Sequence, residues 1–290
     1  MSLTTFSIVA YSAQEDALGV AVASKFLAAA ALVSWAQSGA GAVATQAFAK
    51  VGFGSDGLKM MADGMKAEDV LEKLLANDPN RDHRQVGLVD TKGGAAAHTG
   101  KDCFDWAGHL IGDSFTCQGN ILTGGDTLEA MAEAFRNTEG ELSDRLVAAL
   151  LAGDTVGGDS RGKQSAGVLV VRPNGGYGGD NDLYMDLRVD DDPEPVKKLQ
   201  DLLTMHHLYF GSNDPDKMVA IDGKIAADLQ KILHRLDFYG GPISAEWDVD
   251  TRDAFWAFCG NENLEERWNP EESPEYIDQR VLDFIMERYA

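Results

Sequence analysis

The stretch that decides the fold lies at the start of the chain, where Thr5-Phe6-Ser7-Ile8-Val9-Ala10-Tyr11 precedes Gly19-Val20-Ala21-Val22-Ala23. Both segments are rich in β-branched and small apolar residues, which favour strands. The polar residues between them are typical of a turn. The sequence therefore predicts a β-hairpin over residues 5–23.

Further strands and helices follow in blocks. Strands are predicted at 31–36, 40–47, 84–90, 94–98, 115–120, 164–172 and 182–189, and helices at 57–63, 67–76, 127–136 and 142–152. The helices carry apolar residues at helical spacing. Blocks of strands and helices are typical of an α+β domain with antiparallel sheets. We expect two stacked sheets, each covered by one helix pair.

The run Asp190-Asp191-Asp192-Pro193 marks a change of pattern, because every later segment is predicted to be helical. We therefore predict a layered domain over 4–192 and a small α-helical domain over 193–290. Predicted helices lie at 195–205, 223–236, 250–259 and 277–288. Leu236, Trp247, Phe255, Trp256 and Phe258 are the expected core of this second domain, because aromatic side chains bury the most area.

Composition excludes several classes of protein. The chain has 290 residues, 44% of them hydrophobic, and a formal net charge of −22. It is too apolar to be largely disordered, and its charge disfavours nucleic acid because no basic patch occurs. Its three cysteines cannot form a disulfide framework, and no apolar run approaches the roughly 20 residues of a membrane span. With no signal peptide visible, we expect a cytoplasmic protein without a membrane partner.

Six blocks of sequence resemble one bacterial family, the domain-of-unknown-function 1028 family. They are residues 5–10, 19–26, 41–47, 118–120, 157–165 and 188–191, and they occur in the expected order between residue 5 and about residue 210. The resemblance implies an αββα four-layer sandwich of the N-terminal-nucleophile hydrolase type. It implies no substrate.

A second resemblance covers residues 229–259. Leu229 to Leu233, Leu236 to Ile243, Trp247, Thr251 and the pair Ala254-Phe255 are similar to a helical module of the peptidoglycan-binding type. This resemblance implies a glycan or a peptidoglycan fragment as a possible partner.

Thr5 is the candidate nucleophile. An N-terminal-nucleophile enzyme uses a Thr, Ser or Cys at the chain start, whose freed α-amine serves as the general base. Thr5 opens the first strand at the matching place, and Thr4 is the alternative if it becomes the terminus. Lys25 ends the second strand, where its ammonium could lower the pKa of that amine. In the structural alternative, Thr5 is a strand residue and Lys25 an exposed lysine.

Other polar residues at strand ends are candidates for the rest of the site. Asn120, after Gln118, could donate to the oxyanion of an acyl-transfer reaction or could enter a turn. The candidate substrate-binding residues are Ser24, Gln46, Gln118, Asp159 and Arg161. Structural roles in strands and loops remain open for all of them.

We expect no metal and no cofactor. The spacing of His98, Cys103 and His109 matches no standard zinc pattern. Residues 157–163 imitate a phosphate loop, but Gln164 stands where such a loop needs Ser or Thr, and the loop runs from helix to strand.

The sequence thus leaves an amide-bond hydrolase as the leading hypothesis, with a small-molecule or peptide amide as substrate. A non-catalytic binding protein on the same fold and a cell-wall-associated protein remain alternatives. A homodimer is also possible.

Overall fold

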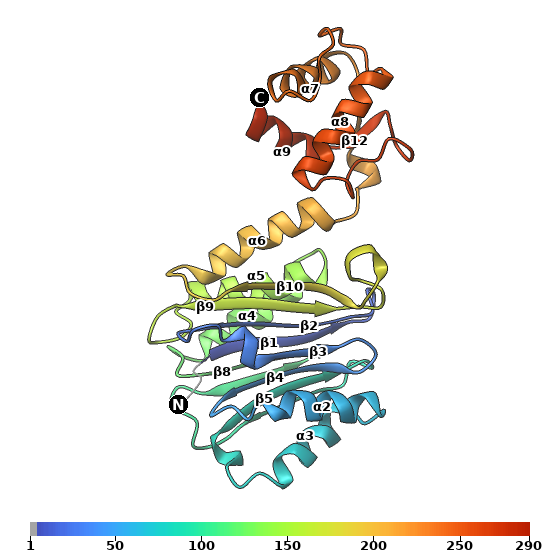
Figure 1. The fold of residues 1–290 in the computed structure, drawn as a ribbon. Helices are drawn as coiled ribbons and strands as arrows, with labels where there is room; N and C mark the ends of the chain where they lie inside the picture. Colours follow the sequence, from blue (N-terminus) through green and yellow to red (C-terminus); the bar gives the residue numbers. More distant parts are fainter. Residues whose placement is uncertain (1–4) are drawn as a thin grey trace. The chain divides into compact units, whose positions relative to one another are not determined.

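The computed structural model describes residues 5–290, and the chain divides into two compact units between Leu203 and Thr204. The first unit combines antiparallel sheets with helices, and the second is mainly helical (Figure 1). The predicted α+β class and the helical C-terminal region are therefore confirmed. The predicted boundary after residue 192 falls in the loop that precedes α6 (Pro195–Phe210).

A six-stranded sheet forms the centre of the first unit, with the strand order β10-β9-β2-β1-β8-β7 and antiparallel pairing throughout. Its strands are β1 (Thr5–Ser12), β2 (Ala17–Ser24), β7 (Gly108–Gly112), β8 (Phe115–Asn120), β9 (Ser165–Val171) and β10 (Leu183–Val189). The hairpin predicted at the N-terminus is β1 and β2, the two central strands.

A four-stranded antiparallel sheet packs on the first, with the order β3-β4-β5-β6. Its strands are β3 (Ser34–Gln37), β4 (Gly41–Ala47), β5 (Arg84–Asp90) and β6 (Ala95–Thr99). Helices α2 (Gly52–Ala62) and α3 (Ala67–Ala76) cover its outer face, while α4 (Asp126–Asn137) and α5 (Leu142–Thr155) cover the six-stranded sheet (Figure 1).

Three apolar clusters fill the spaces between these layers. Phe6, Ile8 and Ala10 of β1 pack with α4 and α5, whereas Val9 lies in the cluster between the sheets. Alternate residues of a strand point to opposite faces. Thr5 and Ser7 therefore lie on the same face as Val9, toward the second sheet, and both are fully buried.

The structure differs from the prediction at three elements. Residues 31–36, predicted as one strand, divide between the short helix α1 (Ala30–Val33) and β3, because the alanine run suits a helical turn. α2 begins at Gly52 rather than at residue 57. The sequence does not reveal this start because the glycines there carry no apolar pattern. At Gly54 the glycine is needed, since a Cβ would lie 2.2 Å from the Trp35 ring. β7, with glycine at both ends, was not predicted.

The second unit packs α7 (Gly223–Arg235), α8 (Val249–Glu262) and α9 (Gln279–Tyr289) around one apolar cluster. Phe255 and Phe258 are buried there as predicted, but Trp256 is 38% exposed because consecutive helical residues point about 100° apart, which turns Trp256 away from the cluster. A two-stranded sheet of β11 (Met218–Ala220) and β12 (Tyr276–Asp278) was not predicted, since three-residue strands carry too little pattern.

One buried cation organises this unit. Arg267 is almost fully buried, donates to the carbonyl groups of His207 and Gly211 at 2.7 Å each, and lies 3.2 Å from the Asp278 carboxylate. Among residues 5–290, no helix has both the length and the apolar character needed to cross a bilayer.

Candidate active site

A row of polar side chains crosses four strands at one end of the six-stranded sheet. Thr5, the first residue of β1, pairs with Asn120, the last of β8, and Ser24, the last of β2, pairs with Ser165 of β9. The hydroxyl Oγ1 of Thr5 donates to Ser24 Oγ at 3.3 Å. Residues paired directly across antiparallel strands present their side chains on the same face. The structure therefore brings Thr5, Ser24 and Asn120 together, facing the second sheet.

A second polar row faces the first from the four-stranded sheet. Gln46 at the end of β4 pairs with Gln85 of β5, and Gln85 pairs with Thr99 of β6. The amide Nε2 of Gln46 donates to the carbonyl of Thr5 at 3.3 Å. Gln46 and Gln85 are fully buried. The two sheets are thus joined at this end by hydrogen bonds rather than by apolar contacts.

Gln85 is the centre of this network, although it was not among the site residues predicted from the sequence. Its Nε2 lies within hydrogen-bond distance of Thr99 Oγ1 (2.9 Å) and of two backbone carbonyl groups, one in β7 (3.0 Å) and one in β8 (2.7 Å). Its Oε1 accepts from the amides of Gln46 and Asn120, both at 2.9 Å. The one signal in the sequence is a glutamine that directly precedes the apolar residues of a predicted strand.

These bonds determine the orientation of the Asn120 side chain. Backbone carbonyl groups can only accept, so Gln85 must direct its nitrogen at them and its oxygen at Asn120. The Nδ2 group of Asn120 therefore donates to Gln85, while its Oδ1 is buried and has no hydrogen-bond partner among residues 5–290. A buried acceptor without a donor is costly in free energy. The unsatisfied atom of Asn120 is thus an acceptor, on the residue opposite Thr5.

Ser7 and Gln118 extend the cluster one step along the strands. They are paired across β1 and β8, and Gln118 Nε2 donates to Ser7 Oγ at 2.7 Å. The Ser7 hydroxyl donates to Gln46 Oε1 at 2.6 Å. Gln118 was predicted as a site residue, whereas Ser7 was missed. Its position two residues after Thr5, on the same face of a strand, was the available signal.

The three charged candidates lie in and beside the loop that precedes β9. Asp159 is buried and accepts from the backbone N–H of Lys25 at 3.0 Å. Arg161 holds the same carboxylate through Nη2 (2.8 Å) and Nε (3.1 Å). The exposed ammonium of Lys25 donates to the carbonyl of Lys163 at 3.1 Å. Asp159 thus anchors this loop to the end of β2, next to Ser24.

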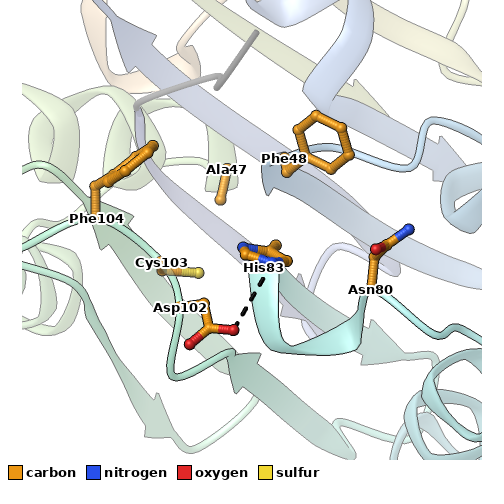
Figure 2. Close-up of a pocket in the computed structure, with 7 residues that line it drawn as sticks. All are labelled: Ala47, Phe48, Asn80, His83, Asp102, Cys103 and Phe104. Carbon is orange, nitrogen blue, oxygen red and sulfur yellow. Dashed lines mark ion pairs between the residues drawn. The ribbon is translucent and has the colours of Figure 1, made fainter.

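A pocket of about 310 Å³ opens beside the polar cluster (Figure 2). Its lining comes from the ends of β4 and β5 and from the loop between β6 and β7; the residues are Ala47, Phe48, Asn80, His83, Asp102, Cys103 and Phe104. Of these residues, only Cys103 was a candidate from the sequence, as a zinc ligand. The others come from three segments distant in sequence, so no local motif marks them.

The pocket wall contains one imidazole, that of His83, and one thiol, that of Cys103. His83 Nε2 lies 3.7 Å from the carboxylate of Asp102, and Figure 2 shows both beside Cys103. The Cys103 thiol donates to the carbonyl of Arg84 at 3.5 Å. Burial raises the pKa of this thiol. A raised pKa lowers the thiolate fraction, so Cys103 is a poor nucleophile.

The three residues weighed as zinc ligands have other partners. His98 Nε2 contacts the carbonyl of Arg81 at 3.0 Å, and His109 Nδ1 contacts Thr99 Oγ1 at 2.9 Å. Burial, followed by the charge of His98, lowers the pKa of His109. Among residues 5–290, no group of three or more His, Cys, Asp or Glu side chains is placed to hold a metal ion.

Comparison with known proteins identifies relatives of both units. The model described as "Family of unknown function (DUF1028)" matches residues 5–199, and one described as "Putative peptidoglycan binding domain" matches residues 209–285. A crystal structure of a DUF1028 protein from Silicibacter pomeroyi is similar at 32% identity and a TM-score of 0.64. That match covers 70% of this chain and 86% of the other. No curated protein matches the chain.

Proposed function

We propose, for a chain that belongs to the domain-of-unknown-function 1028 family, that its first unit is an amide-bond hydrolase of the N-terminal-nucleophile type. The observation that carries the proposal is the row of Thr5, Ser24 and Asn120 across three adjacent strands, next to a pocket. The layering of helices, two sheets and helices supports an αββα sandwich of that type.

The proposed reaction begins once Thr5 is the first residue of the chain. Its free α-amine, with an ordinary pKa of roughly 7.7–8.0, takes the proton of the Thr5 hydroxyl. Oγ1 attacks the amide carbonyl, the C–N bond breaks, and the leaving amine takes the proton from the α-ammonium. An ester between Oγ1 and the acyl group results. Water, deprotonated by the same amine, then hydrolyses this ester and restores the threonine.

Two features of the cluster suit this chemistry. Ser24 Oγ lies 3.3 Å from Thr5 Oγ1, close enough to donate its own hydrogen to Oγ1 when the Thr5 hydrogen turns toward the amine. The unsatisfied Oδ1 of Asn120 is suited to accept an N–H from the freed amine, which would direct the amine lone pair at the hydroxyl. Asn120 retains a second N–H for the predicted oxyanion role. The effect of the Lys25 ammonium on the pKa of the amine stays a prediction. Thr4, the alternative nucleophile, lies outside the described residues.

The test uses a chain cleaved from a fusion so that Thr5 is its first residue. This form should hydrolyse members of a panel of small amides and should acquire the mass of an acyl group from a β-lactone probe. Thr5→Val, which keeps the branched shape and removes the hydroxyl, should do neither. Ser12→Ala, at the opposite end of β1, is the matched control and should retain both activities. Equal turnover by Thr5→Val would show that Thr5 is only a strand residue.

We propose a second function, glycan binding, for the second unit, because residues 209–285 match the peptidoglycan-binding family. An open pocket of about 470 Å³ on this unit is lined by Phe238, Tyr239, Asp250 and Asp253, among others. Aromatic rings beside carboxylates suit a sugar, which offers both C–H surface and hydroxyl groups.

Co-sedimentation with insoluble peptidoglycan tests this second proposal. The double variant Asp250→Asn with Asp253→Asn should lose binding, while the control Asp283→Asn on α9 should not. Equal sedimentation of both variants would exclude this pocket as the binding site.

A further inference from the structure

We infer that the pocket between Phe48 and Phe104 binds a compact, uncharged aromatic group on the acyl side of the amide substrate. This inference names a substrate class for the hydrolase proposed above and rests on that function.

The pocket borders the residues that surround Thr5. Ala47, in its wall, directly follows Gln46, whose amide contacts the Thr5 carbonyl at 3.3 Å. On the other side, the carbonyl of Phe104 accepts from the backbone N–H of Ile121 at 3.1 Å, and Ile121 directly follows Asn120. One part of the wall is thus adjacent in sequence to Gln46, and another is hydrogen-bonded to the residue that follows Asn120. We therefore assign the pocket to the group attached to the carbonyl at Thr5.

The wall presents two exposed aromatic rings. Phe48 is 47% exposed and Phe104 is 61% exposed, and they lie on either side of Ala47 (Figure 2). Exposed aromatic surface gains free energy when a ligand covers it. Aromatic rings also prefer other aromatic rings in offset or edge-to-face geometry. The pocket therefore favours an aromatic group over a saturated one of similar size.

The Phe48 side of the pocket is held rigidly. The guanidinium of Arg84 lies 5.1 Å from the centre of the Phe48 ring and donates to the Phe48 carbonyl. Arg84 is itself buried and paired with Asp78 at 2.7 Å. A wall that is ordered before binding loses less conformational entropy when the ligand arrives. A rigid wall of this kind is typical of a binding site that is selective for the shape of its ligand.

Size and charge narrow the ligand further. A volume of about 310 Å³ lies at the small end of ligand pockets, which span about 300–1,000 Å³. It suits one ring on a short linker. The Asp102 carboxylate lies in the lining, and the whole chain carries a net charge of −22. Both disfavour an acidic acyl group by like-charge repulsion.

Binding to the intact chain tests the inference without any turnover. The probes are 3-phenylpropanamide, its cyclohexyl analogue and its 4-carboxyphenyl derivative, followed by saturation-transfer NMR and titration. We expect 3-phenylpropanamide to bind about 2–10-fold more tightly than the cyclohexyl analogue, the range for one aromatic contact. The carboxylated probe should bind more weakly still.

Variants locate the binding site. Phe104→Ala should weaken binding of 3-phenylpropanamide about tenfold, whereas Phe210→Ala, which removes a 51% exposed ring outside the pocket, should leave it unchanged. Phe104 is exposed, so its loss should leave the melting temperature near that of the parent. Equal affinity for the ring and its saturated analogue, or unchanged binding by Phe104→Ala, would overturn the inference.

The outcomes separate this inference from the proposed function. If the Thr5-first chain is inactive but the intact chain binds the aromatic probe through Phe104, the hydrolase fails and the binding site stands. If the Thr5-first chain hydrolyses aliphatic amides as fast as aromatic ones, and Phe104→Ala has no effect on either, the aromatic assignment fails and the hydrolase stands.

Discussion

The buried ion pair between Arg84 and Asp78 offers the sharpest test of what stabilises this end of the first unit. Arg84 Nε lies 2.7 Å from the Asp78 carboxylate, and Nη1 donates to the carbonyl of Phe48. The two side chains are only 7% and 3% exposed. Asp78→Asn keeps the shape and removes the negative charge, which leaves a buried guanidinium without its counter-ion.

The expected cost is large because both charges are shielded from water. Removing one partner of a buried pair costs about 3–5 kcal/mol. The double replacement Asp78→Leu with Arg84→Met removes both charges, so its cost should come mainly from the unsatisfied Phe48 carbonyl, about 1–3 kcal/mol, since the backbone N–H of Asn80, which also loses its acceptor, lies on an exposed residue. The double variant should therefore be more stable than Asp78→Asn alone. Asp82→Asn is the control, since its pair with Lys101 is exposed and worth about 0–1 kcal/mol.

The assay must report on the first unit separately. Tryptophan fluorescence would not do so, because both units contain tryptophans. Hydrogen exchange of peptides from β4 and β5, measured in increasing urea, reports on the first unit alone. A loss below about 1 kcal/mol for Asp78→Asn, or a double variant less stable than the single one, would refute the reasoning about burial.

The pH dependence of the same pair has a defined sign. The hydrogen bond from Arg84 is the main cause that lowers the pKa of Asp78 below its ordinary value of 3.8. A lowered folded-state pKa gives stability that is fully present above the unfolded pKa, about 3.9, and is lost as the pH falls through the folded value. The stability difference between the parent and Asp78→Asn should therefore be constant above about pH 5 and shrink below about pH 4.

Three further results are expected. Gln85→Leu, which leaves several buried polar groups without partners, should destabilise the first unit by at least about 3 kcal/mol in the same exchange assay; a neutral effect would contradict the central role of Gln85. Gly87→Ala should lower the melting temperature, because its Cβ would lie 2.2 Å from the Gln118 side-chain oxygen; an unchanged value would show that this side chain can move aside. A thiol reagent at neutral pH should modify Cys103 slowly and the two buried cysteines only after unfolding, since burial raises the pKa of all three thiols; rapid reaction of all three would disprove their burial.

Local pattern was sufficient for most of the secondary structure. The β-branched and small apolar residues of 5–11 predicted β1, and apolar spacing predicted helices such as α7 within a residue or two. Both periods arise from backbone geometry and are read over a few neighbouring residues. The failures, at α1 and the start of α2, fall where alanine and glycine carry no amphipathic signal.

The residue types of the candidate cluster were also visible in the sequence. Thr5, Ser24, Gln46, Gln118 and Asn120 each stand at or near the end of a predicted strand, and the structure places them in one network. Their mutual distances were not predictable, because strand order and register depend on contacts between segments that lie tens of residues apart.

The sequence by itself thus determined most of the strands and helices, the α+β class with a helical C-terminal region, and the family. Only the tertiary structure decided that Gln85 joins the two sheets and that loops near residues 47, 83 and 103 enclose one pocket. The physical reason is the range of the interactions. A helix or strand can be predicted from the pattern of neighbouring residues along the chain. A buried hydrogen-bond network and a pocket exist only where segments distant in sequence meet.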